Sequence, residues 1–158
     1  WGTLPLVVFF FLTFIGGCTG STAGGVKIFR FAVLWQAVGG YIRERISPNE
    51  IVMPSFAGRR ITDDITTGVL MFALMVALTV TFSSVALSAM GLDLLTAITG
   101  SATAVSNVGP GLGPVIGPSG NYQSLPDAAK WVLSIDMLLG RLEYFTLVVI
   151  LTPAFWRT

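Results

Sequence analysis

The chain has 158 residues, of which 53% are hydrophobic and 11% are charged, and its formal net charge is +1. Soluble domains carry roughly 25% charged residues, so this composition predicts an integral membrane protein. A single cysteine excludes an internal disulfide, and the absence of histidine argues against zinc, haem and Ser-His chemistry. The small net charge gives no indication of nucleic-acid binding.

The first apolar segment, residues 4–15, is shorter than the roughly 20 residues that a transmembrane helix needs. A second apolar segment, residues 26–41, follows a loop of small residues. Two half-length helices joined in this way predict a broken transmembrane helix, a feature of transport sites. Because the chain starts at Trp1 without Met or a charged leader, we expect a fragment. The loop comprises Gly16, Gly17, Cys18, Thr19, Gly20, Ser21, Thr22, Ala23, Gly24 and Gly25.

This small-residue loop allows several interpretations. Its glycines allow close helix packing, or they form a mobile gate within the membrane, and the two roles are compatible. It departs from the phosphate-loop pattern, because Val26 separates Gly25 from Lys27 and no Ser or Thr follows the lysine. A membrane enzyme that uses Cys18 or Ser21 as a nucleophile is an alternative, although the chain has no histidine to activate either residue.

Residues 43–66 form a polar connector that holds four of the nine basic residues. The positive-inside rule therefore places this connector in the cytoplasm. Asp63 and Asp64 are expected to cap the helix that follows. The next segment, residues 67–90, is apolar and uncharged, which predicts a complete transmembrane helix that carries the chain outward.

Asp93 is expected to cap a short helix over residues 94–105, which cannot span the membrane. This helix leads into a loop rich in glycine, Ser106-Asn107-Val108-Gly109-Pro110-Gly111-Leu112-Gly113. Irregular backbone at membrane depth is tolerated only inside protein or along a wet cavity, and carbonyls facing such a cavity are what an ion-selectivity filter needs. The alternative is an ordinary loop outside the membrane.

The polar segment 117–127 contains no basic residue and is expected on the outer side. The last apolar stretch, residues 128–156, returns inward and contains Asp136, Arg141 and Glu143. Charges within a membrane helix are costly, so they should face the protein interior or the pore. Arg141 and Glu143 are two residues apart and point to different faces of a helix, so a pair between them is not expected.

Together these segments predict an all-α integral membrane protein with a helix–pore loop–helix repeat, as in potassium channels, and a broken transmembrane helix. We divide the chain into the broken helix (1–42), the cytoplasmic connector (43–66) and the repeat (67–158). One pore loop cannot close a ring, so several such units must surround a pore, on one longer chain or in an oligomer.

Three runs of sequence resemble the C-terminal part of TrkH-type potassium transport subunits of the Trk/Ktr/HKT superfamily. They are residues 14–27 (FIGGCTGSTAGGVK), residues 106–113 (SNVGPGLG), and residues 139–146 (LGRLEYFT) with residues 152–157 (TPAFWR). The resemblance covers essentially the whole chain. It implies four helix–pore–helix repeats in the full-length protein, of which this chain would hold the end of the third and all of the fourth.

The resemblance also implies roles for individual residues. Asn107, Val108, Gly109 and Pro110 would form the filter, with potassium at the first three of them. The loop at 16–25 would act as the gate beneath the filter, and Arg141 would project toward the pore as a barrier. The filter differs from the symmetric filter of potassium channels, so selectivity over sodium is open.

The expected function is therefore potassium uptake across a bacterial inner membrane by a multi-pass protein, with potassium as substrate and no covalently bound cofactor. The resemblance further implies a homodimer and a cytoplasmic nucleotide-binding regulatory subunit, besides the remainder of the chain and membrane lipid. A channel and a proton- or sodium-coupled symporter both fit. The alternatives are the membrane enzyme described above and a structural fragment that is inert alone.

Overall fold

The computed structural model describes residues 2–18, 21, 24–47, 55–56 and 59–142, together with residues 144, 146, 149, 152 and 156. These residues form helices α1 to α5 and one small hairpin. The predicted all-α class and the helix–loop–helix arrangement are confirmed.

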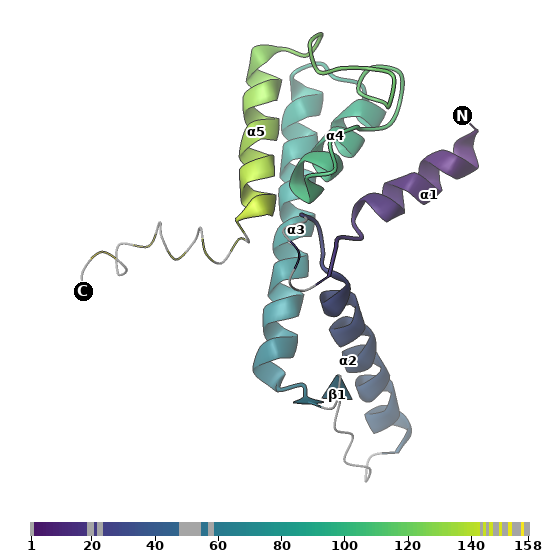
Figure 1. Cartoon of the computed structure of the whole chain (residues 1–158), viewed down its shortest axis with the longest axis vertical. Helices are drawn as coiled ribbons and strands as arrows, with labels where there is room; N and C mark the ends of the chain where they lie inside the picture. The colour runs from purple at the N-terminus through teal and green to yellow at the C-terminus, as the bar shows by residue number, and fades with distance from the viewer. Residues whose placement is uncertain are drawn as a thin grey trace.

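The predicted broken helix consists of α1 (Thr3–Thr13) and α2 (Ile28–Ile46). With 11 residues, α1 is about 16 Å long, roughly half of the hydrocarbon thickness of a bilayer. Figure 1 shows the two helices leaving the intervening loop in different directions. In the last turn of α2, Arg43 and Arg45 place positive charge where the helix dipole favours it.

A short hairpin lies in the predicted connector. Its strands are β1 (Ser55–Phe56) and β2 (Arg59–Arg60), which pair antiparallel with Ser55 opposite Arg60. Two residues per strand are too few for an alternating pattern, so the sequence carries no signal for this hairpin. The hairpin sits at the end of α3 opposite to the loop that follows α4 (Figure 1).

The long central helix is α3 (Asp63–Ala89). Among the described residues it is the helix that is long and apolar enough to cross a membrane: it has 27 residues, and an 18-residue stretch within it has a mean hydropathy of 2.2. The prediction that Asp63 and Asp64 cap it is wrong, because Thr62 holds the N-cap position and makes no capping hydrogen bond with its side chain. The two aspartates lie in the first turn, where their negative charges interact favourably with the positive end of the helix dipole.

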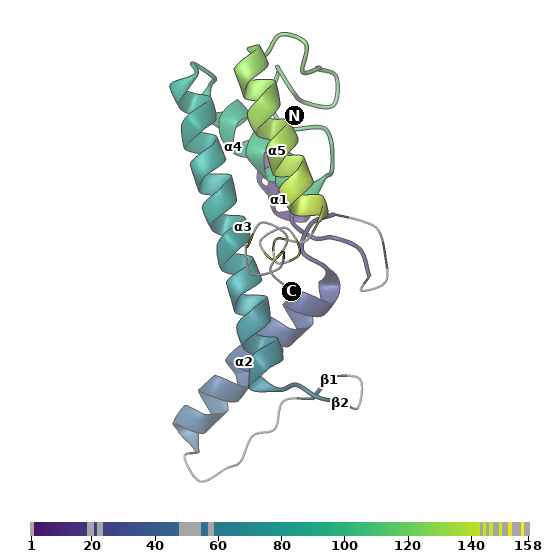
Figure 2. The ribbon, with the colours of Figure 1, turned by 90° about the vertical axis from the view of Figure 1, so that its left-hand side faces the viewer.

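The short helix α4 (Leu94–Ser106) begins as predicted, because the Asp93 carboxylate accepts a hydrogen bond of 3.2 Å from the Leu95 amide. Residues 99–106 are all buried, and most of them are small. Figures 1 and 2 show α4 alongside the half of α3 that also packs against α5 (Asp127–Arg141). Small side chains allow this close approach of three helices.

Helix α5 ends at Arg141, whereas the apolar stretch of the sequence continues to residue 156. Most residues beyond 142, including Glu143, lie outside the described part of the chain. Near its end α5 touches α4 directly: a Cβ atom placed on Gly140 would overlap the carbonyl oxygen of Val105. The core shared by the repeat consists of side chains from α3, α4, α5 and the loop between the last two, among them Leu87, Ala97, Ile116 and Leu133.

The Asp136 carboxylate joins α5 to α3. It is 2% exposed, and its Oδ1 atom accepts a hydrogen bond of 2.7 Å from the hydroxyl of Ser83. Among the described residues its Oδ2 atom has no hydrogen-bond partner. The expectation that a charge in this stretch faces the protein interior is confirmed for Asp136, and the hydroxyl of Ser83 offsets part of the cost of burying it.

We predict that Ser83→Ala lowers the free energy of unfolding by about 1–3 kcal/mol, because it leaves a buried carboxylate without a donor. The matched control is Ser84→Ala, since within the described part of the chain the Ser84 hydroxyl bonds to the Val80 carbonyl of its own helix, at 2.6 Å, and not to another helix. Thermal unfolding of the purified protein in detergent measures both effects. Equal shifts in melting temperature for the two variants would contradict a stabilising role for the Ser83–Asp136 bond.

Candidate functional site: the loop after α4 and the glycine-rich loop beside it

The loop that leaves α4 turns sharply through left-handed backbone. Asn107 is the C-cap residue with a φ of 54°, and Gly109 has a φ of 108°. The Asn107 amide donates to the Ala104 carbonyl at 3.0 Å, and the Val108 amide donates to the Thr103 carbonyl at 3.1 Å. The negative end of the α4 dipole therefore points into this loop, an arrangement that favours a cation there.

Side chains of neighbouring elements hold the loop in place. The Asn107 side-chain amide donates to the Met137 carbonyl of α5 at 3.1 Å. The Leu112 amide donates to the hydroxyl of Thr99 on α4 at 3.2 Å. Because both helices contribute anchors, the position of the loop depends on how α4 and α5 pack.

The carbonyl groups of the loop fall into two kinds. Gly109 offers its carbonyl oxygen to two hydroxyl donors, Tyr122 at 2.5 Å and Thr103 at 3.4 Å. The carbonyls of Asn107 and Val108 accept no hydrogen bond from the described part of the chain. Two adjacent unengaged carbonyls are available to ligate a cation.

The glycine-rich loop between α1 and α2 closes on itself through backbone bonds. Ile15 and Val26 form a parallel bridge, and the Gly16 amide donates to the Val26 carbonyl at 2.9 Å. The Ile28 amide also donates to the Gly17 carbonyl, at 3.3 Å. Four predicted gate residues lie outside the described residues, namely Thr19, Gly20, Thr22 and Ala23.

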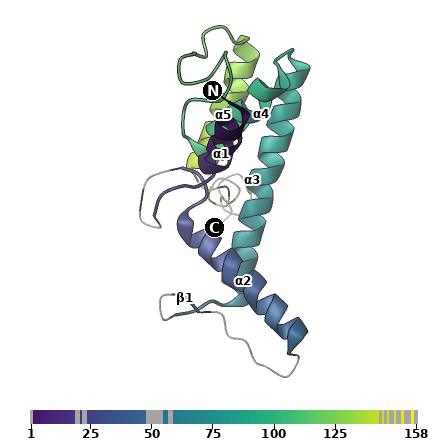
Figure 3. The same cartoon turned by 90° about the vertical axis from the view of Figure 1, so that its right-hand side faces the viewer.

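The two loops meet at Gly24. A Cβ atom placed on Gly24 would lie 2.6 Å from the carbonyl oxygen of Ser106 and 2.7 Å from the Cβ atom of Asn107. Figure 3, turned from the view of Figure 1, shows α1 next to α4 in the upper part of the view and α2 in the lower part. The glycine-rich loop and the loop after α4 therefore touch at Gly24, a contact that no local sequence signal indicates.

Arg141 occupies the last position of α5, directly after Gly140, and its side chain is exposed. Since Gly140 touches the Val105 carbonyl, Arg141 lies one residue beyond the contact between α5 and the end of α4. Cys18 is also exposed, and the Ser21 amide donates to its carbonyl at 3.0 Å. The pair belongs to the small-residue loop, but the chain has no histidine to form a catalytic arrangement with it.

Sequence reasoning missed Tyr122. It is the sole aromatic residue in the polar segment 117–127, and this is the one sequence signal that could have indicated a structural role for it. Its acceptor is 13 positions away, so the partner could not be read from spacing.

Comparison with known proteins gives a consistent result. The family model for TrkH, described as a cation transport protein, matches residues 1–157. The Trk system potassium uptake protein TrkI of Halomonas elongata is 52% identical over 157 residues, covering 99% of this chain and 32% of that protein. The Trk system potassium uptake protein TrkH of Escherichia coli K12 is 38% identical over 144 residues, covering 91% of this chain and 29% of that protein.

The fold also matches a solved structure. The crystal structure of the potassium transporter TrkH from Vibrio parahaemolyticus superposes with a TM-score of 0.86 at 35% identity, over 99% of this chain and 33% of that one. The chain thus spans about a third of the length of the relatives it matches. These relatives are named as potassium transport proteins and not as enzymes.

Proposed function

Because the chain belongs to the TrkH family of cation transport proteins, we propose that it forms one part of a potassium uptake pathway across a bacterial inner membrane. The observation that carries the proposal is the loop at the end of α4. It presents two adjacent carbonyls, those of Asn107 and Val108, which accept no hydrogen bond within the described part of the chain. The names of the relatives supply potassium as the ion.

In this proposal Asn107, Val108, Gly109 and Pro110 form the filter segment of one pore loop. A potassium ion exchanges hydration water for the carbonyl oxygens of the loop, and the C-terminal end of α4 adds a favourable negative potential. The inside-negative membrane potential drives the ion inward by about 2.3 kcal/mol per charge per 100 mV. One loop supplies part of a ring, so the remaining ligands come from the rest of a multi-pass transporter.

The glycine-rich loop, residues 16–25, acts as the gate. The contact between Gly24 and Ser106 supports this role, because it places the loop directly against the end of the helix that carries the filter. Small residues allow the loop to shift without moving large side chains. Arg141 adds a positive charge that opposes cation passage below the filter, since like charges repel most strongly where water is scarce.

Partners follow from the same proposal. The transporter works as a homodimer in membrane lipid, and a cytoplasmic nucleotide-binding subunit biases the gate. Both a channel and a coupled symporter use the arrangement described here. A channel moves potassium alone, whereas a symporter moves protons or sodium ions with it in a fixed ratio. Measured ratios of these fluxes distinguish the two.

The filter assignment predicts that Gly109→Ser lowers the discrimination between potassium and sodium. A φ of 108° is strained for a residue with a side chain, so the loop must change its path. Ion uptake is measured with the full-length transporter in a bacterium that lacks its own potassium uptake systems. Gly91→Ser is the matched control, because Gly91 has a φ of 89° at the end of α3, away from the filter. An unchanged uptake ratio in the Gly109 variant would remove this residue from the filter.

The gate assignment predicts that Gly24→Ala raises potassium flux several-fold in the absence of the regulatory subunit. The added methyl group would lie 2.6 Å from the Ser106 carbonyl oxygen, so it pushes the loop away from the filter. Flux through purified full-length protein in liposomes measures this effect. Gly39→Ala is the control, since no atom lies within 4 Å of a Cβ at Gly39. A flux no higher than that of the parent would argue against the gate.

The barrier assignment predicts that Arg141→Ala also raises the flux of cations several-fold, because it removes a positive charge from the path. The same liposome measurement applies, at two salt concentrations. Arg43→Ala serves as the control because Arg43 lies at the far end of α2. If the Arg141 variant lowers the melting temperature and leaves flux per molecule unchanged, then Arg141 has a packing role only.

A further inference from the structure

The carbonyl oxygen of Gly109 accepts a hydrogen bond from a tyrosine. The Tyr122 hydroxyl donates a hydrogen bond of 2.5 Å to it, while the hydroxyl of Thr103 lies farther away, at 3.4 Å. Short hydrogen bonds between a hydroxyl and a carbonyl oxygen are the stronger ones. Tyr122 is therefore the principal anchor of this carbonyl.

Little else determines the orientation of the peptide group after Gly109. The residue has no side chain, and a Cβ built on it would meet no atom within 4 Å. Its φ of 108° lies in a region that glycine enters freely. Without the hydroxyl of Tyr122, packing alone would not prevent this carbonyl from rotating.

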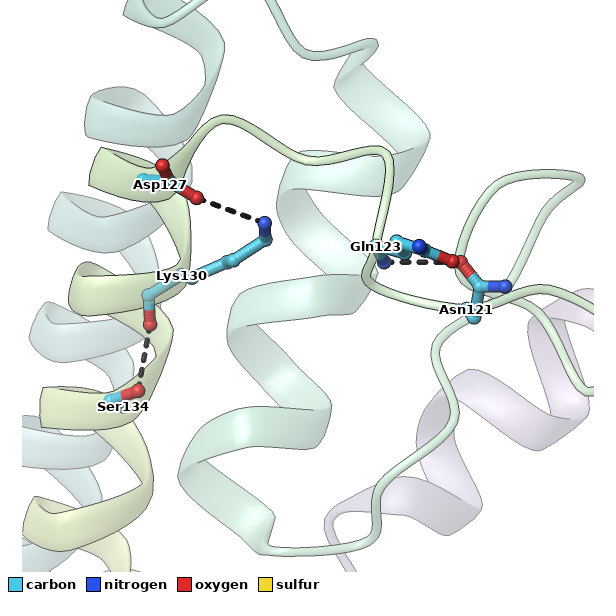
Figure 4. Close-up of polar contacts among 5 residues, drawn as sticks. All are labelled: Asn121, Gln123, Asp127, Lys130 and Ser134. Atoms are coloured by element: carbon cyan, nitrogen blue, oxygen red, sulfur yellow. Dashed lines mark hydrogen bonds and ion pairs between the residues drawn. The ribbon is translucent and has the colours of Figure 1, made fainter.

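A cavity of about 160 Å³ lies behind the loop, and Gly109, Tyr122 and Lys130 line it. The Lys130 ammonium is 3.0 Å from the Asp127 carboxylate, and Figure 4 shows its side chain on the side of α5 that faces α4. Its positive charge at the cavity attracts a carbonyl oxygen that points there. Figure 4 also shows the Gln123 amide bonded to the side chain of Asn121 at 3.0 Å, which holds the turn around Tyr122.

We propose that Tyr122 is a positioning residue of the filter: its hydroxyl fixes the orientation of the Gly109 carbonyl and, with it, the geometry of the loop that also carries the carbonyls of Asn107 and Val108. This inference rests on the proposed potassium pathway and adds a determinant of ion selectivity to it. A carbonyl that can rotate between two positions gives the filter an adjustable size. Where selectivity comes from the fixed size of the site, an adjustable filter accepts sodium more readily than a filter of fixed geometry does.

The test removes the hydroxyl with Tyr122→Phe in the full-length transporter and compares uptake of potassium and of sodium in a bacterium that lacks its own potassium uptake systems. We expect uptake of potassium to persist and the ratio of sodium to potassium uptake to rise about two- to tenfold, the range that the loss of one hydrogen bond allows. Tyr41→Phe is the matched control, because the hydroxyl of Tyr41 contacts Arg45 on α2, away from the filter. Membrane levels of each variant are measured by immunoblot.

Tyr122→Met, which also lacks the hydroxyl but can adapt its shape, replaces Tyr122→Phe if the latter does not reach the membrane. A raised sodium ratio in either variant, with none in Tyr41→Phe, supports the inference. A ratio equal to that of the parent, with potassium uptake intact, overturns the role of Tyr122 and leaves the potassium pathway standing. The purified full-length parent is also measured in liposomes; if it takes up neither ion there, the proposed function fails, and the inference fails with it.

Discussion

Close backbone contact at the C-terminal end of α4 is the constraint on which the rest of the structure depends. Gly24 reaches the Ser106 carbonyl from the glycine-rich loop, and Gly140 reaches the Val105 carbonyl from α5. A side chain at either position would separate elements that now touch. The loop after α4 therefore occupies a position that three segments define together, and a shift in any one of them reaches the two carbonyls proposed to face the ion. Such direct contact provides a physical route between the proposed gate and the proposed filter.

Polar groups within this apolar chain are arranged so that most of the buried ones have a partner. The Thr99 hydroxyl accepts a hydrogen bond from the Leu112 amide. The Tyr122 hydroxyl donates to the Gly109 carbonyl, and the Ser83 hydroxyl donates to the Asp136 carboxylate. In surroundings without water each such bond replaces hydration that the group has lost, so its absence is costly. The carbonyls of Asn107 and Val108 accept no hydrogen bond within the described part of the chain, so a cation can supply a partner there.

Several features of the fold could be predicted from the sequence because local physics determines them. Segment lengths and composition indicated the broken helix, the long α3 and the short α4, and the carboxylate of Asp93 caps α4 as its position suggested. The prediction that Asp63 and Asp64 cap α3 was wrong, because they are the first and second residues of the helix and Thr62 is its N-cap. Helix boundaries depend on one or two residues of backbone geometry that composition does not specify. The roles of Asn107, Gly24 and Arg141 in transport stay predictions that flux measurements decide.

The sequence by itself determined the membrane character of the chain, the order and approximate extent of its helices, and its family, because runs of apolar residues and local motifs carry that information. Tertiary structure alone decided which groups meet. It brought Gly24 to Ser106 across about 80 positions of sequence, paired Asp136 with Ser83 across 53 positions, and directed Tyr122 at Gly109 across 13. These contacts depend on how α3, α4 and α5 pack in three dimensions, and no residue involved differs locally from others of its type that make no such contact.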